Sequence, residues 1–212
     1  ALPAQERALQ EQLKESPKDL EAALFLVEIF LQDQRYSEAR DLLEKVRIAS
    51  PETREVLIIL ERLYTRQDKV DEAIEVLEKL ARLNPREAYD YLHRAADLAL
   101  GQGDLEGALE RTRRVVNINP AAPDAHERVG DLYVRMGRTK EAVQAWRQVL
   151  LLDPRNDTIR FKLADLYRAM EDFKREREEL IYLVRETTHP SDALKAGKRL
   201  LEVAIASGGL RE

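Results

Sequence analysis

Apolar residues recur at helical spacing along almost the whole chain. Between residues 20 and 53, Leu26 and Phe30 lie on one apolar face, and Ala39 and Leu43 lie on a second. Spacing of three and four residues is typical of amphipathic helices, so this segment predicts two helices joined by a short polar turn, Gln32 to Arg35. No apolar run reaches the length of about 18 residues that a membrane-spanning helix requires, so direct membrane insertion is not expected.

The two-helix pattern repeats along the chain. Its landmarks recur at spacings of 34 or 35 residues: Pro17, Pro51, Pro85, Pro120 and Pro154, with Ala39, Ala73, Ala108 and Ala142 in step. A small residue at one fixed position predicts close contact between two antiparallel helices. Proline lacks an amide hydrogen and has a fixed φ, so the recurrent prolines are predicted to end the second helix of each unit.

One segment, residues 126–154, shows the full motif. Its key residues are Gly130, Tyr133, Gly137, Ala142, Trp146 and Pro154. In this order the sequence resembles the tetratricopeptide repeat family, whose repeat is 34 residues long. The resemblance covers roughly residues 4–206. It implies an all-α fold, a right-handed superhelical solenoid of antiparallel helix pairs, in which Tyr133 and Trp146 are core residues.

The resemblance divides a single predicted solenoid, residues 1–212, into repeats 20–53, 54–87, 88–122, 123–156 and 157–190. Residues 4–17 resemble the second helix of a preceding repeat. Residues 191–206 are predicted to form a capping helix, with Ser191 at its N-cap and Leu200, Leu201, Ala204 and Ile205 on its packed side. The fifth repeat is degenerate, because Glu176 takes the place of the alanine and argues against close packing there.

Composition agrees with a helical protein and narrows the classes of function. The chain has 212 residues, of which 35% are charged and 44% hydrophobic, with only 8 glycines and 8 prolines. A net charge of −5 argues against a general nucleic-acid binder, whose phosphate contacts need a basic surface. The chain has no cysteine, which excludes disulfides and cysteine metal sites.

The sequence offers no constellation for catalysis. His93, His126 and His189 are far apart, and none belongs to a metal-ligand motif. The turn from Gly101 to Asp104 is rich in glycine, but it lacks the lysine and hydroxyl residue of a phosphate-binding loop. We therefore expect no enzyme activity, cofactor or metal. Carboxylates on the helices are expected to be solvated or paired with Lys or Arg three or four residues away.

The resemblance also implies a binding surface. In the family, the second, fifth, ninth, twelfth and thirteenth residues of each first helix line the concave groove. At these positions the chain has nine acidic residues, Glu21, Glu28, Glu55, Asp90, Asp97, Asp124, Glu127, Asp131 and Asp165, and four basic ones, Arg62, Arg66, Arg135 and Arg168, leaving a charge of −5. The candidate site comprises Leu24, Ile58, Asp90, His93, Asp97, Asp124, Glu127, Asp131, Arg135 and Asp165.

This groove predicts the kind of partner. The lysines and asparagines with which chaperone-binding family members hold a C-terminal carboxylate are absent, since Leu24, Glu28, Ile58 and Arg62 occupy the corresponding positions. The expected partner is instead a protein segment that is basic, or that alternates basic and apolar residues. An acidic face that merely keeps an open groove soluble remains an alternative.

Two functions stay open at this point. One is a protein-interaction scaffold that captures such a segment. The other is a self-assembly element that stacks through its incomplete terminal repeats into a homo-oligomer. The chain begins at Ala1, which fits both a piece cut from a longer array and a product of signal-peptide removal. The compartment is left open between the cytoplasm, which is favoured, and the periplasm.

Overall fold

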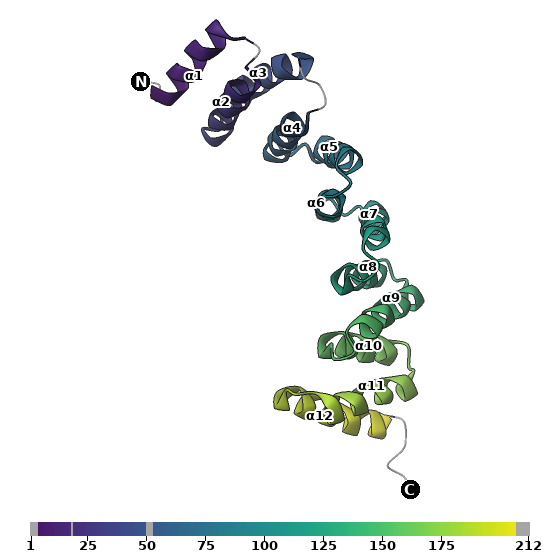
Figure 1. Cartoon of the computed structure of the whole chain (residues 1–212). Coiled ribbons are helices and arrows are strands. Elements are labelled where there is room, and N and C mark those ends of the chain that lie inside the picture. The colour runs from purple at the N-terminus through teal and green to yellow at the C-terminus, as the bar shows by residue number, and fades with distance from the viewer. Residues whose placement is uncertain (1–3, 18, 50–52, 207–212) are drawn as a thin grey trace. The chain divides into compact units, whose positions relative to one another are not determined.

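The computed structural model describes residues 4–17, 19–49 and 53–206, with the side chains of 47–49 excepted. These residues contain α-helices and no strand, so the prediction of an all-α fold is confirmed (Figure 1). The helices are α1 (Ala4–Glu15), α2 (Leu20–Gln32), α3 (Tyr36–Ala49), α4 (Arg54–Arg66), α5 (Val70–Leu83), α6 (Ala88–Gly101), α7 (Leu105–Ile118), α8 (Pro123–Arg135), α9 (Thr139–Leu152), α10 (Asp157–Ala169), α11 (Phe173–Glu186) and α12 (Pro190–Ala206). The landmark Pro51 lies outside the described residues.

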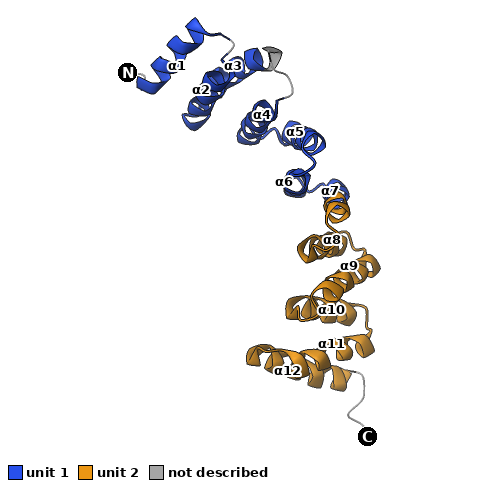
Figure 2. Cartoon of the chain, in the orientation of Figure 1, with its two compact units in different colours: residues 1–111 blue, residues 112–212 orange. Residues whose placement is uncertain are grey.

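The chain divides into two compact units, residues 1–111 and 112–212, with the boundary inside α7 (Figure 2). In unit 1 the pairs α2 with α3 and α4 with α5 pack as helix hairpins, and α2 also contacts α4. In unit 2 the pairs are α8 with α9 and α10 with α11. The predicted organisation as one solenoid over residues 1–212 stays a prediction.

A residue in the left-handed backbone conformation lies in the turn between the first and second helices of each repeat. Among the residues that the structure describes, five have positive φ: Gln34 (59°), Asp68 (57°), Gly103 (81°), Gly137 (70°) and Glu171 (58°). Glycine adopts this conformation without strain, whereas other L-residues do so at a cost of about 1 kcal/mol. The turn from Gln32 to Arg35 therefore has a left-handed residue like the other turns, but it is less stable because Gln34 stands where two other repeats have glycine.

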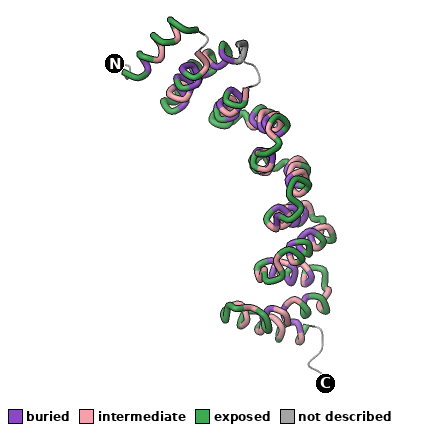
Figure 3. The backbone as a smooth tube through the Cα atoms, viewed as in Figure 1, coloured by how far each residue is buried: buried purple, intermediate pink, exposed green. Residues whose placement is uncertain are grey.

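The repeat alanines lie in the core. Ala39, Ala73, Ala108 and Ala142 all have 0% exposure. In each unit the buried residues lie where neighbouring helices face one another (Figure 3). Tyr133 and Trp146 are buried as well, at 7% and 4% exposure, and the Trp146 indole donates a hydrogen bond to the Glu127 carbonyl oxygen at 3.2 Å. Their prediction as core residues is confirmed.

The degenerate fifth repeat packs around a buried carboxylate. Glu176 has 0% exposure and accepts hydrogen bonds from Arg168 of α10 (2.8 Å) and Arg199 of α12 (3.2 Å). The helices α10 and α11 still share an apolar cluster that includes Ala164 and Leu180. The expectation of loose packing is therefore wrong, because two guanidinium groups compensate the charge that Glu176 brings into the core.

The capping helix differs from its prediction in two respects. It begins at Pro190, so Ser191 lies in its first turn and is not its N-cap; proline at a first helical position needs no amide partner. Its buried face contains Ala196 and Val203, and Leu200 packs against them. Leu201 and Ile205 are 63% and 67% exposed, and Leu194 is 62% exposed. The outer side of α12 therefore carries three exposed apolar residues beside Lys195, Lys198 and Glu202, where a polar-backed cap was expected.

Candidate functional site

An apolar pocket of about 490 Å³ lies between the first helices α2 and α4 of unit 1. Its floor and walls come from Leu20, Leu24, Phe25, Ile58 and Ile59. The sequence of α2 explains this surface, because apolar residues occupy both of its sides. Ala23, Val27 and Phe30 are buried in the core, while Phe25 remains 48% exposed beside the pocket. The predicted groove residues Leu24 and Ile58 thus meet in one hollow.

Charged side chains surround this unit 1 pocket. Glu21, Glu28, Glu55 and Arg62 complete its lining, which leaves a net charge of −2. Arg62 donates a hydrogen bond to Glu28, one repeat earlier in the chain. Within the described part of the chain, no ion pair neutralises Glu21 or Glu55. An apolar floor with an excess of carboxylates at its edge suits an apolar side chain flanked by cationic ones.

A second pocket, of about 480 Å³, lies in unit 2. It is lined by Asp131, Val134 and Arg135 of α8, Trp146 of α9, and Lys162, Asp165 and Leu166 of α10. Three predicted groove residues, Asp131, Arg135 and Asp165, therefore lie together here. The close approach of α8 to the Trp146 ring depends on Gly130, where a Cβ atom would lie 2.3 Å from two atoms of the indole.

Lys162 forms ion pairs with two carboxylates at the unit 2 pocket. Its ammonium donates hydrogen bonds to Glu127 (2.8 Å) and to both oxygens of Asp131 (2.8 and 3.1 Å), and it lies 5.4 Å from the centre of the Trp146 ring. Burial alone would lower the pKa of Lys162, but the hydrogen bonds that its ammonium donates to Asp131 and Glu127 outweigh burial and raise the pKa. Asp165 is paired with Arg199 of α12 at 2.6 Å. The carboxylates of this pocket are thus neutralised from within the chain.

The other predicted groove residues lie apart from both pockets. In α6, the His93 ring is 3.6 Å from the Asp97 carboxylate and stacks at 6.0 Å from Tyr89, and Asp90 is exposed one turn earlier. In α8, Asp124 is exposed in the first turn. Among the described residues, no group of three or more His, Asp or Glu side chains is arranged to hold a metal ion.

Sequence reasoning missed the cations that reach from one first helix to the preceding one. Arg94 contacts the buried Glu61 at 2.6 Å, and Lys162 reaches Asp131. In the numbering of the predicted groove positions, in which Asp90 and Thr158 are second, both are the sixth residue of a first helix, a position that the groove prediction did not count. The signal was present in the sequence, since the sixth residues in order are Phe25, Ile59, Arg94, Arg128 and Lys162. Adding them reduces the predicted charge of the first-helix face from −5 to −2.

Helix pairs that repeat about every 34 residues, most of them with a buried alanine at the same position, define this chain as a tetratricopeptide-repeat protein. A tetratricopeptide repeat model matches residues 127–193, which confirms the resemblance seen in the sequence. The model described as ChAPs (Chs5p-Arf1p-binding proteins) matches residues 21–157, more than half of the chain. The chain belongs to the ChAPs family.

Solved structures share this fold. MamA is 23% identical with a TM-score of 0.55, covering 70% of this chain and 86% of that one. YrrB, titled as a TPR protein with an unusual peptide-binding site, is 18% identical with a TM-score of 0.58, covering 91% and 99%. A structure of Naa15/Naa10 bound to HypK-THB gives 16% identity and a TM-score of 0.72, covering 96% of this chain and 32% of that one. No curated protein matches the sequence.

None of the helices described above is both long and apolar enough to cross a membrane.

Proposed function

We propose that this chain is a non-catalytic protein-interaction scaffold whose unit 1 binds a partner segment containing basic and apolar residues. The observation that carries the proposal is the pocket between α2 and α4, where five apolar side chains form a hollow and three carboxylates stand against one arginine. An apolar residue of the partner would fill the hollow, and flanking lysines or arginines would approach Glu21 and Glu55.

The comparisons support a protein as the class of partner. The ChAPs family is named for binding other proteins, and YrrB is described by its peptide-binding site. The structure itself narrows the acidic groove that the sequence predicts. In the described part of the chain, Glu21 and Glu55 of the unit 1 pocket have no ion-pair partner, whereas the carboxylates of unit 2 pair with Lys162 and Arg199. Unit 1 is therefore the better candidate for a basic and apolar segment.

A labelled peptide of alternating lysine and leucine residues tests this assignment. Changing Phe25 and Ile58 together to alanine removes apolar contact area, and we expect the peptide to bind about tenfold more weakly, which corresponds to about 1.4 kcal/mol. A second variant, with Glu21 and Glu55 changed to glutamine, is expected to weaken binding to a similar degree and to reduce its salt dependence. Fluorescence anisotropy measures both affinities.

Matched controls distinguish binding in the pocket from non-specific binding to the surface of unit 1. Leu83→Ala and Glu110→Gln alter an exposed apolar residue and an exposed carboxylate elsewhere in unit 1, and they are expected to leave the affinity unchanged. A peptide with glutamate in place of each lysine is expected not to bind. Equal affinity of the wild type and both pocket variants for the lysine peptide would contradict the proposal.

Self-assembly is retained as a second candidate because of the outer side of α12. Leu194, Leu201 and Ile205 are more than 60% exposed there, opposite the buried Ala196 and Val203. Isolated apolar residues are ordinary on a surface, but a row of three on one helix is typical of a contact surface. The exposed residues of α1 include Gln5 and Gln12, whose amides would be buried against leucine in a head-to-tail stack. Pairing of two α12 helices avoids that cost.

We expect the chain to associate with itself in a concentration-dependent manner through this surface. Changing Leu194 and Leu201 together to glutamate places like charges at the contact and should shift the chain to monomer. Sedimentation velocity over a range of concentrations measures the effect, with Lys174→Gln at an exposed site of α11 as a control. A wild-type chain that stays monomeric throughout would exclude this candidate.

A further inference from the structure

We infer that the sixth residue of the first helix decides which pocket accepts a basic segment, and that Lys162 excludes such a segment from the pocket of unit 2. This inference rests on the proposed function, and it adds the residue that determines specificity. Lys162 acts as an internal substitute for the cation of a partner.

The residue at the sixth position is apolar in the first two repeats and cationic in the later ones. In α2 and α4 it is Phe25 and Ile59, and both side chains line the unit 1 pocket. In α10 it is Lys162, which lines the unit 2 pocket. The two pockets have nearly the same volume, about 490 and 480 Å³, so they differ in the charge and the apolar residues of their linings and not in size.

The contacts of Lys162 are those that a partner's lysine would make. Its ammonium lies 2.8 Å from a carboxylate oxygen of Glu127 and 2.8 Å from one of Asp131, and it lies 5.4 Å from the centre of the Trp146 ring. Ion pairing combined with an aromatic face is a common way to bind an ammonium group. The lysine is tethered to α10, so its effective concentration at these carboxylates exceeds that of any free peptide.

Arg94 of α6 in unit 1, at the sixth position of the repeat phase, likewise contacts the preceding first helix. Its guanidinium lies 2.6 Å from Glu61 of α4, which is 3% exposed. A cation at the sixth position therefore pairs with a carboxylate of the preceding first helix in each unit. Between α2 and α4 the sixth position is apolar; Arg62 pairs with Glu28 there, while Glu21 and Glu55 have no ion-pair partner among the described residues.

Without Lys162 the unit 2 pocket would resemble that of unit 1. Val134, Trp146 and Leu166 would form an apolar floor, and Glu127 and Asp131 would stand beside it without their ammonium partner. Lys162→Ile places the residue type of Ile59 at this position. Glu127 and Asp131 are 33% and 44% exposed, so water can solvate them and the variant is expected to fold.

The test begins from the Phe25→Ala/Ile58→Ala background, in which unit 1 binds the lysine and leucine peptide weakly. Adding Lys162→Ile is expected to restore about tenfold in affinity. Trp146 is the only tryptophan of the chain and lines the unit 2 pocket, so its fluorescence should respond to the peptide in this variant and not in the background. Circular dichroism confirms that each variant retains its helicity.

Two further variants make the result specific. Lys140→Ile removes the same charge from an exposed site on α9 and should restore nothing, and Lys162→Arg keeps a cation in place and should also leave the pocket closed. If Lys162→Ile leaves the affinity low and Trp146 unresponsive, the inference is overturned while the unit 1 result stands. If the background already binds as the wild type does, the proposed function fails independently of Lys162.

Discussion

Changing Glu176 to alanine is expected to lower the free energy of unfolding by about 3 kcal/mol, although alanine is the residue that the other repeats carry at this position. The loss comes from a carboxylate with 0% exposure that joins three helices. Its oxygen accepts from Arg168 of α10 and from Arg199 of α12, while Glu176 itself belongs to α11.

The expected loss of stability is at the low end for a broken buried ion pair because both arginines keep another partner. Arg168 also pairs with Glu202 and Arg199 with Asp165. Burial of an unpaired charge is therefore avoided, but the void left by the side chain and the lost links between α11 and α12 remain. Urea denaturation followed by circular dichroism measures the change, and hydrogen exchange should locate it in α10 to α12.

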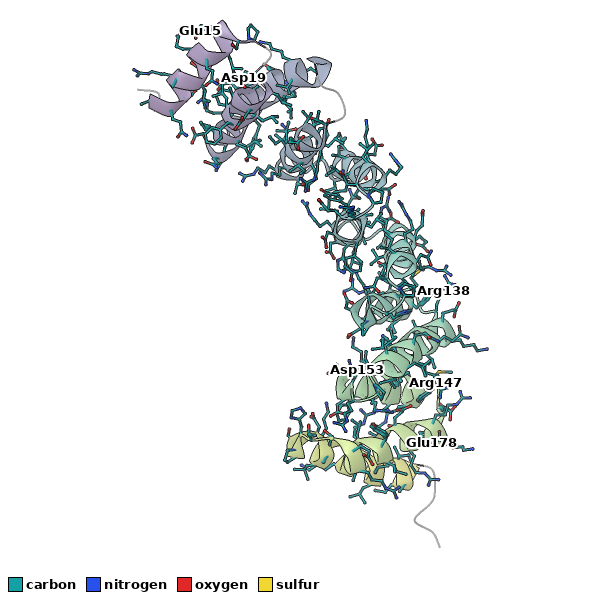
Figure 4. The ribbon with its side chains drawn as sticks, viewed as in Figure 1. Glu15, Asp19, Arg138, Arg147, Asp153 and Glu178 are labelled. Carbon is teal, nitrogen blue, oxygen red and sulfur yellow. The ribbon has the colours of Figure 1, made fainter. Side chains whose placement is uncertain are left out.

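Glu178 provides the matched control for this prediction. It lies on the same helix, its side chain is exposed, and it is labelled on α11 in Figure 4. Glu178→Ala is expected to change the stability by less than about 0.5 kcal/mol. If Glu176→Ala proved as stable as the wild type, the fifth repeat would tolerate the family's small residue, and the buried ion pairs would contribute nothing net.

Residues whose role depends on local spacing could be predicted from the sequence. The alanines at 39, 73, 108 and 142 are all fully buried, and Tyr133 and Trp146 lie in the core as expected. These outcomes follow from a helical period, which fixes the face on which a residue lies without knowledge of its distant neighbours.

Charge pairing could not be predicted in the same way. The sequence suggests pairs three or four residues apart, and Arg138 with Glu141 is one such pair. Many others join residues about one repeat apart, as Lys162 does with Asp131 and Arg54 with Glu87. A long cationic side chain reaches the next helix of the stack, so its partner depends on how helices pack and on which rotamer the packing allows.

The same limit explains why the candidate site changed. Counting charge at five positions of each first helix predicts an acidic wall, but the sixth position contributes Arg94, Arg128 and Lys162 to the same face. Leu24 and Ile58 line one pocket with Phe25, and this meeting required the contact of α2 with α4. Position within a helix was predictable, and proximity between helices was not.

Changing Gly130 to alanine is expected to lower the free energy of unfolding by about 2 kcal/mol and to shift Trp146 fluorescence to longer wavelength. The added Cβ would lie 2.3 Å from the Cδ1 and Nε1 atoms of an indole that is 4% exposed. Because the ring is packed on its other sides, it must move as a whole, which lengthens its hydrogen bond to the Glu127 carbonyl. Helix propensity favours alanine by about 1 kcal/mol, so the expected loss is a net value.

Gly197→Ala is the control, since it adds the same methyl group to a helix of the same unit. Its nearest neighbour outside the helix is the Val184 Cγ2 atom at 4.0 Å, an ordinary contact. This variant is therefore expected to gain up to about 1 kcal/mol with Trp146 fluorescence unchanged. Opposite signs for two identical substitutions would show that Gly130 serves the close approach of α8 to Trp146. A stabilising effect of Gly130→Ala would mean that the indole can shift freely and that this side of the unit 2 pocket is loosely packed.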